Sequence, residues 1–109
     1  MCGPFPRMRA NLYQDLINEV LNEVREQLFE EKVKAKDSLV TSTTDKVIDE
    51  RIEEWTDEYF GANYDDLMER AEKNEEEAME IAREETIGNL YENCQEELVE
   101  EIINKIKSQ

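Results

Sequence analysis

A chain of 109 residues with 29 acidic side chains, 13 basic ones and a net charge of −16 forms one domain at most, and its charge repels nucleic acid and anionic membranes. It has no histidine, so the commonest general base and neutral metal ligand are missing, and two cysteines are too few for a disulfide framework or a zinc site. No apolar run approaches the length of a membrane span. We therefore expect a cytoplasmic protein (intracellular, and in the host cell if viral) that is not an enzyme and carries no metal or cofactor.

Helix-favouring residues dominate, and no stretch alternates with period two for long enough to indicate a strand. Residues 1–9 contain both prolines and are expected to be an irregular lead-in to a single helical domain over residues 10–109. A first helix is predicted from about Ala10 to Lys36, because apolar residues recur at helical spacing between Leu12 and Leu28.

The hydroxyl-rich run Ser38–Asp45 is predicted to interrupt the helices, with an N-cap at Thr43 or Thr44. Leu39 and Val40 are expected to plug the end of the bundle. A second helix follows from about Asp45 to Phe60, with Ile48, Ile52, Trp55 and Tyr59 along one side. Gly61 then stands where a left-handed C′ residue usually ends a helix.

The third predicted helix runs from an N-cap at Asn63 to Lys107. Its connection to the second helix is only two or three residues, which favours antiparallel neighbours. A straight rod of this length would extend roughly 66 Å, whereas a compact chain of this size has a radius of gyration of about 13 Å. The helix therefore either bends near Gly88, which we favour over a loop, or overhangs and meets another chain. The predicted fold is all-α, with three helices, or four if Gly88 breaks the last.

Cys94 and a group of aromatic residues each allow a structural and a functional interpretation. Cys94 lies between Tyr91 and Leu98 at helical spacing, which favours a small core residue over a reactive thiol. The aromatic residues near the connection between the second and third predicted helices either form a core there or anchor a partner protein. The possible anchors are Trp55, Tyr59 and Tyr64.

The acidic run is the strongest functional signal. Six acids lie between Glu75 and Glu85, and like charges at i, i+4 cost a few tenths of a kcal/mol each, about 0.2–0.5. The alternative is an ordinary solvated face. On one helix the acids are too sparse to imitate DNA, at about one per 4.4 Å against about one per 1.7 Å, so the second helix would have to lie alongside. The predicted contact acids are Glu50, Glu54, Asp57, Glu69, Glu76, Glu80 and Glu84.

The composition is similar to that of small, very acidic helical proteins that block defence nucleases or other DNA-binding proteins. By this analogy of composition alone, the leading hypothesis is an inhibitor or regulator of the DNA-mimic kind, such as a phage-type anti-defence protein. Its partner would be a protein with a basic, nucleic-acid-handling surface. The alternative is a helical scaffold or adaptor, or a homodimer, that binds helices through Leu98, Val99, Ile102 and Ile103.

Overall fold

The computed structural model describes the backbone of residues 4–109 and the side chains from Leu12 onward. This part of the chain contains five α-helices and no strand, which confirms the all-α fold class. The number of helices is larger than the predicted three or four. The helices are α1 (Pro4–Glu30), α2 (Asp37–Ala62), α3 (Tyr64–Arg70), α4 (Glu75–Asn93) and α5 (Gln95–Lys107).

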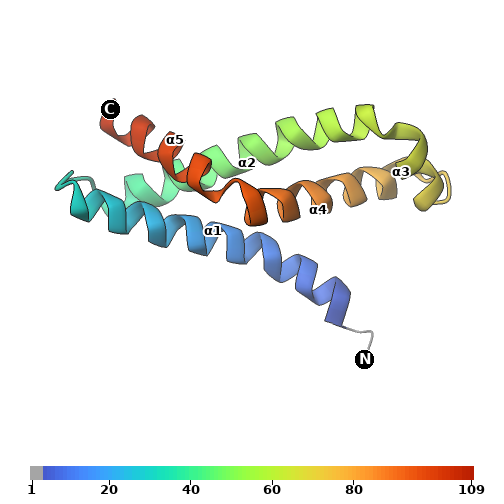
Figure 1. Ribbon diagram of the computed structural model, residues 1–109, viewed down its shortest axis with the longest axis horizontal. Coiled ribbons are helices and arrows are strands. Elements are labelled where there is room, and N and C mark those ends of the chain that lie inside the picture. Colours follow the sequence, from blue (N-terminus) through green and yellow to red (C-terminus); the bar gives the residue numbers. More distant parts are fainter. Residues whose placement is uncertain (1–3) are drawn as a thin grey trace.

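The helices form an elongated bundle with three members (Figure 1). α2 runs back along α1, and α4 and α5 together form the third member, while α3 turns the chain at the far end. The molecule measures 51 × 33 × 21 Å, and its radius of gyration is 16.0 Å. A compact chain of this length would have a radius of gyration of about 13 Å, so the bundle is distinctly extended.

The larger of two hydrophobic cores lies between α1, α2, α4 and α5. Leu16, Val20 and Val24 of α1 are fully buried at i, i+4 spacing and belong to the same buried cluster as Ile48 of α2 and Leu90 of α4. The four apolar residues of α5 that suggested a scaffold function all lie in this core: Leu98, Val99, Ile102 and Ile103. Cys94 also lies in this core with 8 % of its surface exposed, which confirms its interpretation as a core residue.

A second, smaller core holds the end of the bundle where α2, α3 and α4 meet. Its buried members are Leu67, Ala71, Ala78 and Ala82. The alanines of α4 have short side chains, so this helix can approach its neighbours closely. Tyr59, Phe60, Met68 and Ile81 pack around them.

The expected boundaries of the first helix are wrong at both ends. α1 already begins at Pro4, because the first turn of a helix needs no backbone N–H donors and tolerates proline; residues 1–3 lie outside the described part. It ends at Glu30 rather than Lys36 because Lys32 adopts a left-handed conformation with φ 58°. The N–H groups of Lys32 and Val33 then donate to the carbonyls of Phe29 and Leu28, at 3.1 and 2.9 Å, which is the hydrogen-bond pattern of a Schellman motif.

α2 begins at Asp37, so the predicted interruption at Ser38–Asp45 is wrong. Thr43 and Thr44 are buried along the same side as Val40 and Val47, and the threonines therefore serve as part of a helical apolar face. The expected plug is confirmed for Val40, which is 3 % exposed. Gly61 lies inside α2 and has no positive φ, so it does not act as a left-handed C′ residue.

The third predicted helix is broken at two places, and neither of them is Gly88. One break covers residues 71–74, where Glu72 and Lys73 both have positive φ, and the second is at Cys94, between α4 and α5. Gly88 lies within α4, so the bend expected there is wrong. The short connection is confirmed, since Asn63 alone separates α2 from α3. In the part of the chain that the structure describes, none of the helices combines the length and the apolar composition that a membrane span requires.

Candidate acidic binding surface

The negative charge is concentrated at the end of the bundle that α3 closes. We call residues 53–85 the acidic hairpin; they comprise the last turns of α2, all of α3 and the first turns of α4. This segment holds fourteen acidic and three basic residues, so it carries −11 of the total charge of −16. The hairpin is held together by the smaller core, which fixes the backbone positions from which its acids project.

Part of the acidic run has a structural role at the start of α4. The side-chain oxygen Oδ1 of Asn74 accepts a hydrogen bond from the Glu77 N–H at 3.1 Å, which caps the helix. Glu75, Glu76 and Glu77 occupy the first turn, where the helix dipole stabilises negative charge. The sequence interpretation overlooked this helix start, although Asn74 followed by Glu77 is a capping pattern.

The predicted contact acids do not form one flat face. Glu76 and Glu80 lie on the side of α4 opposite the buried Ala78, and Glu84 continues that column. By the same periodicity, Glu54 lies on the side of α2 opposite the buried Ile52. α2 and α4 pack against each other, so their outer acids point away from the pair in different directions.

The remaining predicted acids lie near these two columns or beyond them. Asp57 is exposed on α2 near Met79 and Arg83 of α4. Glu69 is exposed on α3. Glu50 lies farther along α2 beside Lys46 and Lys105, outside the acidic hairpin, and is thus the least suited of the predicted acids to share a site with the others.

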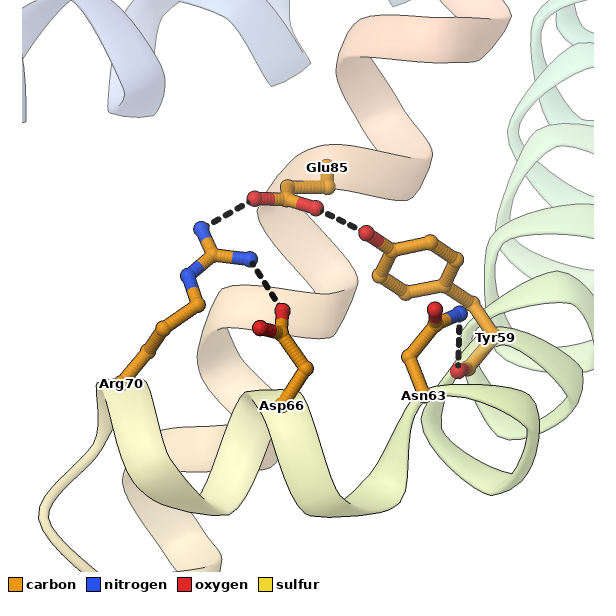
Figure 2. Close-up of polar contacts among 5 residues, drawn as sticks. All are labelled: Tyr59, Asn63, Asp66, Arg70 and Glu85. Carbon is orange, nitrogen blue, oxygen red and sulfur yellow. Dashed lines mark hydrogen bonds and ion pairs between the residues drawn. The ribbon is translucent and has the colours of Figure 1, made fainter.

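Polar contacts tie α3 to α2 and α4 around Glu85 (Figure 2). The Glu85 carboxylate accepts hydrogen bonds from the Tyr59 hydroxyl and the Arg70 guanidinium. Arg70 also pairs with Asp66 at 3.5 Å, and the Asn63 amide donates to the Tyr59 carbonyl at 3.1 Å. The hydrogen bond to Glu85, followed by burial, raises the pKa of Tyr59, so its hydroxyl stays a donor. Sequence reasoning missed Glu85, because its partners lie on two other helices.

The interpretation of the aromatic residues as core of the corner is confirmed only for Tyr59 and Phe60. Tyr59 and Phe60 contact the smaller core, and the Phe60 ring lies edge-on to Tyr64 with ring centroids 5.3 Å apart. Trp55 is half-buried against the larger core, with the Arg51 guanidinium carbon 5.5 Å from its ring centroid. Tyr64 remains 42 % exposed. A role for Trp55, Tyr59 or Tyr64 as a partner anchor stays a prediction.

Two observations describe the potential nucleophile and the potential metal ligands among the described residues. Burial, with a smaller contribution from Glu97, raises the pKa of Cys94, which disfavours the reactive thiolate. From Leu12 onward no group of three potential ligands is placed to hold a metal ion. Comparisons with protein-family models, curated proteins and solved structures gave no significant match. The arrangement of charge therefore carries the functional argument by itself.

Proposed function

We propose that this protein is a non-enzymatic inhibitor or regulator whose acidic hairpin occupies a basic, nucleic-acid-binding surface of another protein. The observation that carries the proposal is the concentration of charge: a net −11 within residues 53–85, on a scaffold of packed helices. Opposite charges accelerate association and set specificity. The basic surface of such a partner would normally bind the phosphates of a nucleic acid.

The density of carboxylates in the hairpin supports DNA mimicry better than a single helix would. The antiparallel parts of α2 and α4 extend over about 16 Å, and α3 adds roughly the width of one helix, ~10 Å. Fourteen carboxylates over this distance correspond to about one per 2 Å, and the net charge to about one per 2.4 Å, against about one per 1.7 Å of duplex DNA.

The distribution of the acids also specifies the shape of the partner. Because the outer acids of α2 and α4 point in different directions, a flat surface would contact only one of the two columns. A groove or channel that encloses its ligand would contact both, as a protein that surrounds a duplex contacts both strands. The proposed partner therefore has a basic groove around its ligand.

Affinity capture tests the proposal. The tagged protein is incubated with nuclease-treated lysate, and retained proteins are washed with rising salt or with short duplex DNA. We expect a basic nucleic-acid-binding protein to be retained and then released by either wash. The triple variant Glu76→Gln/Glu80→Gln/Glu84→Gln should retain much less of it.

The matched control removes three exposed acids outside the hairpin: Glu23→Gln/Glu26→Gln/Glu100→Gln. Both triple variants lose the same charge, and circular dichroism verifies that each is folded. Equal retention by the two variants, or a partner that resists both salt and DNA, would contradict the proposal. The scaffold alternative has lost its motivating observation, since the four apolar residues of α5 are buried within the chain itself.

A further inference from the structure

A groove lined by aromatic and acidic side chains lies between α2 and α4; we call its aromatic part the floor and its carboxylates the rim. It has a volume of about 510 Å³ and lies beside the contacts shown in Figure 2. The α2 side chains that line it are Trp55, Glu58, Tyr59 and Ala62, and the α4 side chains are Glu85, Thr86 and Asn89. We call it the Trp55 groove.

The floor of the Trp55 groove suits a cationic side chain with a long apolar stem. Trp55 and Tyr59 are half-buried, so their rings offer apolar surface without being fully covered. The Arg51 guanidinium carbon lies 5.5 Å from the centroid of the Trp55 ring, which is within the range of a cation–π interaction. Arg51 does not line the groove, whereas the Trp55 ring does, so the groove presents this ring to a cation from outside.

The rim of the groove supplies negative charge in a held position. The Glu85 carboxylate is held by the Tyr59 hydroxyl and the Arg70 guanidinium, which fix its orientation between α2, α3 and α4. Glu58 is exposed on the α2 side. An apolar helix would bury these carboxylates at a large free-energy cost, and a nucleic acid would be repelled by them. A guanidinium, in contrast, forms charge-assisted hydrogen bonds with carboxylates.

We propose that the Trp55 groove binds an arginine side chain of the partner, with its stem on Trp55 and Tyr59 and its guanidinium between Glu58 and Glu85. This inference rests on the proposed function, because it assumes a basic protein partner. It adds a specific subsite to an otherwise diffuse electrostatic surface. Arginine is favoured over lysine because its planar group both stacks on aromatic rings and forms paired hydrogen bonds with carboxylates.

The single tryptophan of the chain makes the groove directly observable. A short arginine-rich peptide is titrated into the full-length protein at low salt while Trp55 fluorescence is recorded, with the corresponding glutamine peptide as the ligand control. We expect a saturable change in emission with the arginine peptide and none with the glutamine peptide. No change in emission with the arginine peptide would overturn the proposal.

Two single variants with the same loss of charge test whether binding is local. Glu58→Gln removes a carboxylate from the groove, and Glu53→Gln removes one from another side of the same helix, near Asp49 and Asp57. Glu58→Gln should weaken binding about threefold, in the range of an exposed ion pair, and Glu53→Gln should change it less than twofold. Equal effects of the two variants would mean that the peptide reads only the overall charge.

The two proposals fail in distinguishable ways. Equal effects of Glu58→Gln and Glu53→Gln would contradict the proposed arginine subsite. If DNA still releases the captured partner, the inhibitor proposal is unaffected. A captured partner that is insensitive to salt and DNA would remove the inhibitor proposal itself, whatever the peptide does.

Discussion

Lys32 adopts the left-handed conformation that marks the end of α1. It adopts φ 58° without being glycine, and the Schellman hydrogen bonds that follow it stop α1 after Glu30. Val33 is half-buried and Leu28 is buried, which matches the apolar contact that accompanies this motif. A left-handed residue with a Cβ costs roughly 1–2 kcal/mol, so the motif stabilises this turn in spite of its sequence.

Replacing Lys32 with glycine should therefore stabilise the protein. Glycine adopts positive φ without the steric cost of a Cβ, although it loses more entropy on folding, so we expect a gain of about 1 kcal/mol in the free energy of unfolding. Urea denaturation followed by circular dichroism measures it. Lys34→Gly is the matched control, because it removes the same charge from a residue without positive φ and should be neutral or destabilising. A gain of the same size in Lys34→Gly would assign the effect to charge rather than to backbone conformation.

At the scale of the helices, apolar periodicity predicted the elements better than the punctuating residues did. The spacing from Leu12 to Leu28 and from Ile48 to Ile52 located the inner sides of α1 and α2 correctly, because the 3.6-residue period determines which side chains share one side of a helix. Expectations that relied on glycine failed: Gly61 and Gly88 both lie within helices. The left-handed positions are occupied by Lys32, Glu72 and Lys73, where hydrogen bonds and packing override local preference.

The candidate site was predictable only in part, for a related reason. The acids of α4 were visible as a helical column, and the requirement that the second helix lie alongside is met by the packing of α2 on α4. Glu85 and Glu58 were missed as site residues, because the groove between them exists only once Trp55 of α2 faces α4. A pattern within one helix cannot reveal a surface that two helices share.

The capping of α4 leads to a prediction about this element. Asn74→Ala removes the side-chain oxygen that accepts from the Glu77 N–H, and it should destabilise the protein by about 1 kcal/mol. Asn74→Asp keeps an acceptor at the same position and should preserve most of the stability. Thermal denaturation of both variants measures the difference. If Asn74→Ala is as stable as the original chain, the start of α4 is fixed by the smaller core and not by its cap.

At the scale of the whole molecule, repulsion among the acidic side chains destabilises the fold. The chain carries −16, and −11 of it lies within the 33 residues of the acidic hairpin, next to a core that contains three alanines and one leucine. Repulsion within the hairpin is long-range and decreases with ionic strength, since the Debye length falls to about 10 Å at 0.1 M salt and ~3 Å at 1 M. Ion pairs such as Arg70 with Glu85 would weaken under the same conditions, so the two effects compete.

We expect repulsion to dominate, and the melting temperature should therefore rise as sodium chloride is added. A gain of about 1 kcal/mol would correspond to a rise of roughly 4 °C for a domain of this size. The triple variant Glu76→Gln/Glu80→Gln/Glu84→Gln should show a smaller rise than Glu23→Gln/Glu26→Gln/Glu100→Gln, because its carboxylates are removed from the most crowded region. A melting temperature that falls with salt in the original chain would mean that ion pairs outweigh repulsion. The folded acidic hairpin would then be close to electrostatic balance on its own, and would gain less from a basic partner than its net charge suggests.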